Sequence, residues 1–367
     1  MSTIAVDARI ISSGTGRYIR GLLQNLEGID SDNIYLVLVR RKDLHYYQPK
    51  NPNFKVIEAE FADYSFGEQL GFNRLLRSLK PDLVHFCMPQ QPLLYTRPAV
   101  TTVHDLNLLR ITANDDMNWL ELRIKKGIFA GLLWLVARRA KQIITPSEFS
   151  KKDLVAFSNI SSDKVTVTLE GAEKADAEPK PIADLQGKRF IMYLGRAEPY
   201  KNNRGLILAH QELLATYPDL RLVIAGAIDK QRKADMKWVS DNAYKQVDFA
   251  GFISDEEAAW LYKNCLAYIV PSFMEGFGLP GLEAMGYGAP VISSNATCLP
   301  EIYKGGAYYF DPHKPGDMAR AITDVFEDEG LRDHLSERGI QVHGSYSWRR
   351  MAEQTLVVYK QVLDQNI

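Results

Sequence analysis

Short apolar runs alternate with segments of helical periodicity along most of this 367-residue chain. In the first half, TIAVDARI (3–10) precedes the helical pattern YIRGLLQNLEGI (18–29), and KQIITPS (141–147) precedes EFSKKDLVAF (148–157). Runs rich in β-branched residues that alternate with helical patterns are typical of a parallel sheet covered by helices on both faces. The pattern therefore predicts an α/β fold.

The composition changes in the middle of the chain. The segment GAEKADAEPKPIADLQGKR (171–189) is rich in alanine, proline and charge and has no apolar period, as expected of an exposed connector. The β-then-α order restarts directly after it with FIMYLG (190–195). We therefore expect two doubly wound domains, at residues 1–172 and 188–345, joined by a linker at 173–187. The last segment, about 346–367, has helical apolar spacing and could pack on either domain.

Open α/β sheets bind ligands at the carboxyl ends of their strands, where the strand-to-helix loops meet. Two such domains in tandem suggest a ligand held in a central cleft that both domains face. The residues that carry chemistry should accordingly stand at strand-to-helix turns.

The segment PSFMEGFGLPGLEAMGYGAP (271–290) is such a turn, and it contains two carboxylates, Glu275 and Glu283. They could be a catalytic acid/base pair, a clamp on a sugar, or exposed helix charge. Gly276, Gly278 and Pro280 do not allow a continuous helix between them.

Pro280 suits the first turn of a helix that begins near Leu279 and ends at Gly286 or Gly288. This prediction places Glu275 in a loop and Glu283 in the first helical turn. The unpaired amides at such a helix start favour an anion such as phosphate. Carboxylates beside a phosphate would repel it, so they are better suited to accept hydrogen bonds from hydroxyl groups.

These residues resemble the E-x7-E segment of retaining glycosyltransferases of the GT-B fold, family 4, which has two Rossmann-like domains. The resemblance covers both halves of the chain in the family's order. Its segments are PSFMEGFGLPGLEAMGYGAPVISSNATCLPEI (271–302), YLGRAEPYKNNRGLI (193–207), LVIAGA (222–227), VDFAGFISDEEAAWLY (247–262), TVHDL (102–106), AKQIITPSEFSKKDL (140–154) and SSGTGRY (12–18). Ser347 and Trp348 resemble the point where the family's last helix crosses back, so residues from about 346 to 367 are placed with the first domain.

The resemblance implies a donor site in the second domain. Gly195, Arg196 and Lys201, in the turn that begins at the end of FIMYLG, are assigned to the donor. Arg196 and Lys201 would hold the diphosphate of a nucleotide sugar, a role that suits charge-assisted hydrogen bonds. Glu283 would bind ribose hydroxyls and Glu275 the donor sugar, which favours a binding clamp. The nearby backbone amides assigned to the donor are those of Phe277, Gly278 and Leu279.

The same resemblance implies roles for residues of the first domain. His104 would reach the donor sugar and the reacting centre, and with Glu275, Arg196 and Lys201 it completes the expected catalytic set. Asp105 would orient its loop, and His85, expected at a strand end, would face the acceptor. The remaining expected contacts come from SSGTGR (12–17): Gly14 and Gly16 permit positive φ and close approach to a ligand, and Arg17 adds charge. The segment ITPSEFSKKDL is interpreted as structural, with Ser147 as a helix cap.

Several alternatives stay open at this stage. Glu275 could act as a covalent nucleophile, although we prefer a front-face reaction in which the departing phosphate oxygen deprotonates the acceptor. GDP-mannose is the preferred donor, a UDP-sugar the next, and a nucleotide-sugar epimerase is a further candidate. The acceptor would be a glycan or a lipid-linked hydroxyl.

A dinucleotide oxidoreductase is disfavoured because no strand is followed by GxGxxG. No cofactor or metal is expected, since we find no DxD sequence that would chelate a metal between phosphates, and Arg196, Lys201 and the helix start already supply positive charge.

Composition and charge indicate the compartment and the kinds of partner, but not the reaction. The net charge of −1 gives no nucleic-acid footprint, although residues 1–172 carry 22 basic against 18 acidic residues. Three scattered cysteines suggest a reducing compartment, and the first residues show no secretory signal, so we expect a cytoplasmic protein. The apolar run 127–137 has basic flanks. It predicts either a buried helix or a helix lying on the inner face of a membrane. Nothing in the sequence indicates the oligomeric state.

Overall fold

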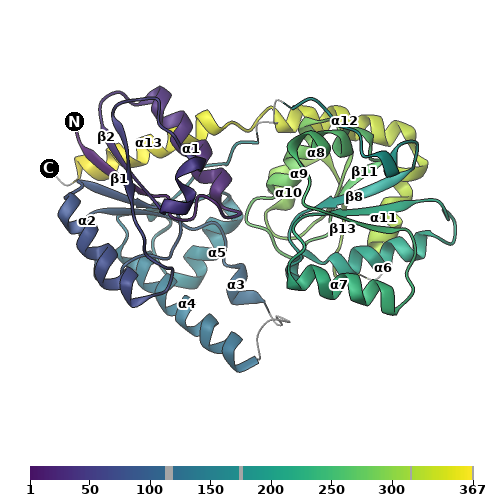
Figure 1. Ribbon diagram of the computed structural model, residues 1–367, viewed down its shortest axis with the longest axis horizontal. Coiled ribbons are helices and arrows are strands. Elements are labelled where there is room, and N and C mark those ends of the chain that lie inside the picture. Colours follow the sequence, from purple (N-terminus) through teal and green to yellow (C-terminus); the bar gives the residue numbers. More distant parts are fainter. Residues whose placement is uncertain (112–118, 173–176, 315, 366–367) are drawn as a thin grey trace. The chain divides into compact units, whose positions relative to one another are not determined.

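The computed structural model describes residues 1–111, 119–172, 177–314 and 316–365, and the chain forms two compact units (Figure 1). The first unit contains Met1–Leu109, Ile124–Gly171 and Ser347–Ile367, and the second contains Arg110–Arg123 and Ala172–Tyr346, as far as these ranges are described. Each unit has its own parallel sheet. The predicted α/β class, with two doubly wound domains, is confirmed.

The sheet of the first unit has seven strands in the order β3-β2-β1-β4-β5-β6-β7. All of its pairings are parallel, and Ala5 lies opposite Leu36 on one side and Val84 on the other. The strands are β1 (Thr3–Asp7), β2 (Ile34–Val39), β3 (Phe54–Glu58), β4 (Leu83–Phe86), β5 (Ala99–Thr102), β6 (Gln142–Thr145) and β7 (Val165–Val167).

The helices of this half follow from the apolar periodicity. In α1 the buried residues Ile19, Leu22, Leu23 and Leu26 recur every three or four positions and so form one face. Ser147 accepts a hydrogen bond from the Ser150 amide, so the predicted cap is confirmed. The helices are α1 (Gly16–Ile29), α2 (Asn73–Leu79), α3 (Asn107–Arg110), α4 (Trp119–Arg139), α5 (Glu148–Ser158) and α13 (Trp348–Asp364), with shorter helical turns η1 (Arg41–Tyr46), η2 (Gly67–Phe72) and η3 (Ser162–Lys164).

The last helix, α13, packs on α1 and β4 of the first unit, and Figure 1 shows α13 beside α1. Trp348 at its start lies against two glycines. A Cβ at Gly21 would come within 2.5 Å of the Trp348 ring, and one at Gly171 within 2.2 Å of the Trp348 backbone nitrogen. The absence of side chains at both positions therefore allows the chain to return to the first sheet.

The sheet of the second unit has six parallel strands in the order β10-β9-β8-β11-β12-β13. They are β8 (Phe190–Leu194), β9 (Arg221–Ala225), β10 (Val247–Gly251), β11 (Ala267–Val270), β12 (Val291–Ser294) and β13 (Ala307–Phe310). The helices are α6 (Asn203–Leu213), α7 (Lys230–Asp241), α8 (Asp255–Asn264), α9 (Leu279–Gly286), α10 (Leu299–Tyr303), α11 (Asp317–Glu327) and α12 (Glu329–His343), with helical turns η4 (Ala183–Leu185), η5 (Pro199–Lys201) and η6 (Lys304–Gly306).

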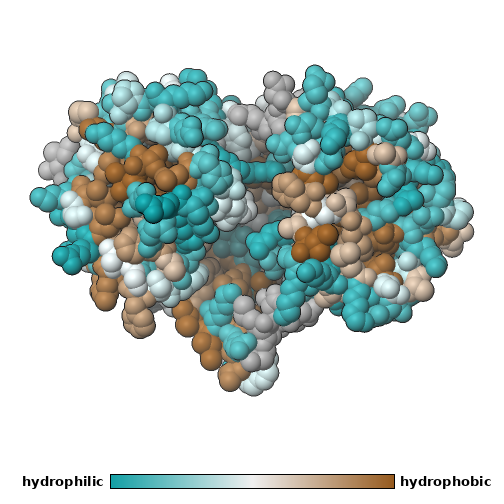
Figure 2. Space-filling model, in the orientation of Figure 1, coloured by the Kyte–Doolittle hydropathy of each residue, from teal (hydrophilic) through white to brown (hydrophobic). Residues whose placement is uncertain are grey.

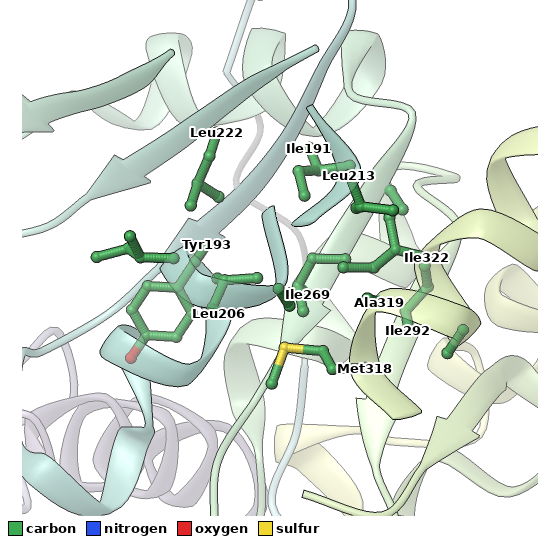
Figure 3. Close-up of a cluster of buried hydrophobic side chains, with 14 of the residues drawn as sticks. Ile191, Tyr193, Leu206, Leu213, Leu222, Ile269, Ile292, Met318, Ala319 and Ile322 are labelled. Carbon is green, nitrogen blue, oxygen red and sulfur yellow. The ribbon is translucent and has the colours of Figure 1, made fainter. Parts of the chain in front are cut away.

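The core of the second unit lies between this sheet and the helices α6 and α11. Ile191 and Ile269 of the sheet meet Leu206 of α6 and Met318 and Ile322 of α11 (Figure 3). Of the predicted linker 173–187, residues 173–176 lie outside the described part of the chain. The rest holds η4, and the Lys180 amide donates to the Glu256 carbonyl.

The strand order determines where each unit can bind a ligand. The chain leaves β8 toward β9 on one side, whereas it leaves β11 toward β12 on the other. In open parallel sheets, ligands bind at the carboxyl edge where the strand order reverses in this way, and the same argument applies to β1 and β4 in the first unit. Lys201 and Glu275 lie in the loops after β8 and β11, whereas His104 and Asp105 follow β5.

Candidate functional site

The loops that follow β8 and β11 are joined by an ion pair between Lys201 and Glu275. Lys201 Nζ lies 2.7 Å from Glu275 Oε1 and 2.8 Å from Oε2. The Lys201 side chain is 17% exposed and that of Glu275 12% exposed. Ser272 Oγ donates to the same carboxylate at 2.7 Å, and the Phe273 amide donates to the Tyr200 carbonyl. The structure thus brings together two of the four predicted catalytic residues.

The ion pair determines the charge state of Lys201. Burial disfavours the ammonium form, but the charge and hydrogen bond of Glu275, together with the nearby Tyr193 and Tyr200, outweigh burial and raise the pKa of Lys201 above its usual value. Lys201 is therefore a permanent cation at the carboxyl edge of the second sheet. A cation held there can bind an anionic ligand, and the carboxylate beside it can accept hydrogen bonds from hydroxyl groups.

Glu275 is also held through its backbone. Its amide donates to Thr297 Oγ1 at 3.0 Å, and Cys298 Sγ lies 3.3 Å from its carbonyl oxygen. Thr297 has a φ of 54°, which is unusual for a β-branched residue and indicates local strain. The loop after β12 therefore fixes the position of Glu275.

The start of α9 agrees with the prediction. The helix begins at Leu279 with Pro280 in its first turn and ends at Gly286. Its N-cap, Gly278, has a φ of 95°, and a Cβ there would lie 2.5 Å from the Tyr303 hydroxyl, which donates to the Gly278 carbonyl. Only glycine suits this position.

The amides of Phe277, Gly278 and Leu279 have no hydrogen-bond partner within the described ranges of the chain. Free amides at a helix start attract anions. Glu283, however, is the fifth residue of α9, so its predicted place in the first helical turn is wrong. Because a turn has about 3.6 residues, a helix that begins at Leu279 puts Glu283 in its second turn, where its side chain is half-buried.

Arg196 follows Gly195 in the turn after β8, and its side chain is 67% exposed. Its Nη2 lies 3.1 Å from Glu198 Oε1. Its carbonyl is fixed from the interior, because it accepts from the Tyr193 hydroxyl at 2.9 Å and from Asn203 Nδ2 at 3.3 Å. The backbone of this turn is therefore held while the guanidinium stays accessible.

His104 lies in the first unit, just beyond the carboxyl end of β5, and is 18% exposed. Its Nε2 is 3.1 Å from the Cys87 carbonyl, and its Nδ1 is 3.3 Å from Glu170 Oε1. A carbonyl and a carboxylate can only accept, so both ring nitrogens carry protons in this arrangement. Burial lowers the pKa of His104, but Glu170, with smaller contributions from the Cys87 carbonyl and Asp105, more than reverses this effect, so the pKa is raised.

The prediction that His85 faces an acceptor is wrong. His85 lies within β4 and is fully buried, with Nδ1 2.5 Å from the Tyr359 hydroxyl and Nε2 2.8 Å from Thr102 Oγ1. Burial lowers the pKa of His85 to about 3, so it is neutral. Asp105, by contrast, accepts from the Asn107 amide at the start of α3, which fits an orienting role.

The glycine turn after β1 also differs from the prediction. Neither Gly14 nor Gly16 is among the residues with positive φ. Gly16 does allow a close approach, but to protein, since a Cβ there would lie 1.8 Å from the Ile11 carbonyl oxygen. Gly14 has open space around it, and Arg17 is exposed on α1. That Gly14, Gly16 and Arg17 bind a ligand therefore stays a prediction.

The described residues contain no group of three or more histidine, cysteine or acidic side chains that could hold a metal ion. The chain does contain one DxD sequence outside the segments considered above, at Asp30, Ser31 and Asp32. It precedes β2, away from the carboxyl edge, and Asp30 Oδ2 accepts from Tyr35 and Asn33. Its surroundings are those of a structural turn.

Sequence reasoning missed four residues that hold the candidate ones: Ser272, Thr297, Tyr303 and Glu170. Ser272 could have been found, since it follows β11 and stands three residues before Glu275. Glu170 also follows a strand end, that of β7, at the edge where His104 was expected. Thr297 and Tyr303 contact the site only through the tertiary fold.

Comparison with known proteins agrees with this geometry. Residues 12–173 match the family described as Glycosyltransferase Family 4, and residues 175–342 match Glycosyl transferases group 1. The chain belongs to the family 4 glycosyltransferases of the GT-B fold. The family resemblance found in the sequence is thereby confirmed, and the protein is a glycosyltransferase.

Its relatives include O-antigen chain mannosyltransferase B of Escherichia coli, 29% identical over 71% of this chain and 70% of the relative. Another is the serotype-specific mannosyltransferase WbdA of the same organism, 30% identical over 61% of this chain but only 29% of the relative. The glycosyltransferase thus matches less than a third of WbdA.

Solved structures share its fold. Sucrose-phosphate synthase from Thermosynechococcus elongatus superposes with a TM-score of 0.81 at 18% identity over the full length of both chains. HepE of Anabaena, in complex with UDP and glucose, has a TM-score of 0.73 at 16% identity over 98% of this chain and all of that one. At these identities the likeness shows the fold alone.

The pair of His104 and Glu170 predicts a pH-dependent stability of the glycosyltransferase. Because the pKa of His104 is raised in the folded state, the pair stabilises fully below the unfolded pKa of about 6.5 and is lost as pH rises through the folded pKa. The free energy of unfolding of wild type minus that of Glu170→Gln should fall by about 1 kcal/mol between pH 6 and pH 9. Urea unfolding at both values measures it. Glu337→Gln, an exposed control on α12, should show no such change.

Proposed function

We propose that this glycosyltransferase is a retaining mannosyltransferase that moves mannose from GDP-mannose to a hydroxyl of a glycan or lipid-linked acceptor. The observation that carries the donor site is the ion pair of Lys201 and Glu275 at the carboxyl ends of β8 and β11. The choice of mannose is supported by the relatives, which are named as mannosyltransferases at 29–30% identity.

In this proposal the donor lies across the turns after β8 and β11. The diphosphate binds Arg196, Lys201 and the amides of Phe277, Gly278 and Leu279. All of these groups are cations or free donors, as an anion needs. Glu275 accepts from hydroxyls of the donor sugar, and Glu283, in its second-turn position, from those of the ribose.

Glu275 binds the sugar and does not attack it. Its carboxylate is engaged by Lys201 Nζ at 2.7 Å and 2.8 Å and by Ser272 Oγ at 2.7 Å. A carboxylate so paired is a weak nucleophile, which supports the front-face reaction over a covalent intermediate. The phosphate oxygen that leaves accepts the acceptor's proton, and Arg196 and Lys201 stabilise its developing charge. Both ring nitrogens of His104 face the Cys87 carbonyl and Glu170, so His104 would have to break one of these contacts to donate to a ligand.

A nucleotide-sugar screen tests the proposal and its UDP-dependent alternative together. GDP-mannose at 100 times its dissociation constant should stabilise the protein by about 2.7 kcal/mol, seen as a rise in Tm. Incubation with donor and a glycan acceptor should release GDP and form an α-linked product. A rise in Tm with UDP-sugars but not with GDP-mannose would show that the donor is a UDP-sugar. Conversion of the donor without an acceptor, to an epimer, would contradict transfer itself.

We also propose that transfer needs no divalent metal. In this proposal Arg196 and Lys201 neutralise the diphosphate, so an added cation would have little charge left to offset. Excess EDTA should therefore change kcat by less than about twofold. Loss of activity in EDTA that returns with Mg²⁺ or Mn²⁺ would overturn this point.

A peripheral contact with an anionic membrane is proposed for α4. Ile124, Ile128 and Trp134 are exposed on this helix, and Figure 2 shows hydrophobic surface where α4 lies. Its exposed basic residues, which complement acidic lipids, are Arg123, Lys125, Arg138 and Arg139. No described helix is both long and apolar enough to cross a membrane.

The α4 contact has a direct test. The double change Ile124→Glu and Ile128→Glu should weaken co-sedimentation with phosphatidylglycerol vesicles by about fivefold or more, because two apolar groups become charged. Ile340→Glu on α12 is equally exposed and serves as the control. Equal binding by all three proteins would count against the contact.

A further inference from the structure

A buried arginine lies directly behind the turn that carries Arg196. Arg232 is the third residue of α7, and its side chain is 1% exposed. Asp229 caps the helix by accepting from the Arg232 amide. The Arg232 guanidinium donates through Nη2 to the Gly195 carbonyl at 2.8 Å. Since Gly195 follows β8, this places a buried positive charge at the carboxyl edge of the second sheet.

Two nitrogens of this guanidinium, Nε and Nη1, are buried without a hydrogen-bond partner in the part of the chain that the structure describes. The nearby Asp235 accepts instead from Arg204 Nε at 2.9 Å. Burial lowers the pKa of Arg232, although a guanidinium stays protonated at neutral pH. A buried, charged and incompletely bonded side chain costs folding free energy. An anion bound at the neighbouring turn would offset that cost.

The geometry of the turn points to the same place. The Gly195 carbonyl faces Arg232, and in a trans peptide the N–H of the next residue points the opposite way. The Arg196 amide is therefore directed away from Arg232, and it has no partner within the described ranges. Gly226, with a φ of 133°, permits this packing, because a Cβ there would lie 2.1 Å from the Gly195 oxygen.

We propose that Arg232 is a positioning residue for the donor diphosphate. It fixes the Gly195–Arg196 peptide so that the Arg196 amide faces the ligand. It also places its own positive charge behind that amide, in addition to those of Arg196 and Lys201. The proposal rests on the proposed function, since it takes a nucleoside diphosphate to bind at the turn after β8. Its effect concerns the phosphates and not the base or the ribose.

Calorimetric binding of GDP and UDP, compared with guanosine and uridine, tests the proposal on the full chain. Arg232→Met removes the charge and the hydrogen bond to Gly195, and it should weaken binding of the diphosphate by at least tenfold while leaving binding of the nucleoside unchanged. Arg232→Lys keeps a charged donor and should recover part of the loss. Lys233→Met, an exposed cation on the same helix, is the matched control and should bind like wild type.

The outcomes separate this inference from the proposed function. If wild type binds neither diphosphate, the proposed function fails. If Arg196→Ala weakens diphosphate binding but both Arg232 variants bind like wild type, the inference is overturned and the function stands. Equal weakening of diphosphate and nucleoside would show a merely structural role and also overturn it. Should Arg232→Met not fold, Arg232→Lys decides by the same ratio of diphosphate to nucleoside affinity.

Discussion

Replacing Lys201 with methionine is expected to lower kcat by about 100-fold or more, because one fixed charge that stabilises the leaving diphosphate disappears. The same change should destabilise the fold by about 1–3 kcal/mol, since the Glu275 carboxylate, only 12% exposed, loses its cationic partner and keeps the hydrogen bond from Ser272. Initial rates with the donor identified by the screen and urea unfolding measure the two effects.

A double variant separates the two roles of this pair. Adding Glu275→Gln to Lys201→Met removes the unpaired carboxylate, so it should recover most of the lost stability while kcat stays low. Lys188→Met, an exposed lysine before β8, should change neither quantity. If Lys201→Met turns over within threefold of wild type, the cation has no role at the leaving group.

The sequence predicts the fold and the turns well because both depend on local patterns. The alternation of strands and helices indicates two parallel sheets, and Pro280 after a glycine-rich loop marks the start of α9. Glu275 and Lys201 each follow a strand end, and adjacent strands of a parallel sheet bring their carboxyl ends to one edge. Their meeting therefore follows from topology once β8 and β11 are neighbours.

The wrong predictions concern side chains that are buried by, or hydrogen-bonded to, residues from distant parts of the chain. His85 looks like a residue at a strand end, but its position within β4 buries it, and its partner Tyr359 stands 274 residues later. Glu170 likewise meets His104 across 66 residues. No local pattern shows which polar side chain a fold will bury or which partner will satisfy it.

Glycine has the same ambiguity. Gly14, Gly16, Gly226 and Gly278 all stand in turns after strands, yet only the last two have positive φ. At Gly16 the missing Cβ makes room for the Ile11 carbonyl, whereas at Gly226 it makes room for the turn that contains Gly195. A glycine in a sequence therefore does not show whether a ligand, the chain itself or nothing comes close, as the open space around Gly14 illustrates.

Arg196→Ala is expected to lower turnover by about 10- to 100-fold, since a charge-assisted contact with the leaving diphosphate contributes about 1.5–3 kcal/mol. The fold should not change. The side chain is 67% exposed and pairs with Glu198 at the surface, so the free energy of unfolding should stay within about 0.5 kcal/mol of wild type. Arg196→Lys should fall between, because an ammonium cannot bind phosphate in the bidentate manner of a guanidinium.

The matched control for this prediction is Arg189→Ala at the opposite end of the same strand. Arg189 precedes β8, is similarly exposed and pairs with Asp219, so it removes one arginine and one surface ion pair without touching the carboxyl edge. It should leave both kcat and donor affinity as in wild type. Steady-state rates and donor binding for the two alanine variants then compare the two ends of β8 directly. An active Arg196→Ala protein with unchanged donor affinity would remove the turn after β8 from the donor site, whereas loss of activity in both variants would assign the effect to general surface charge.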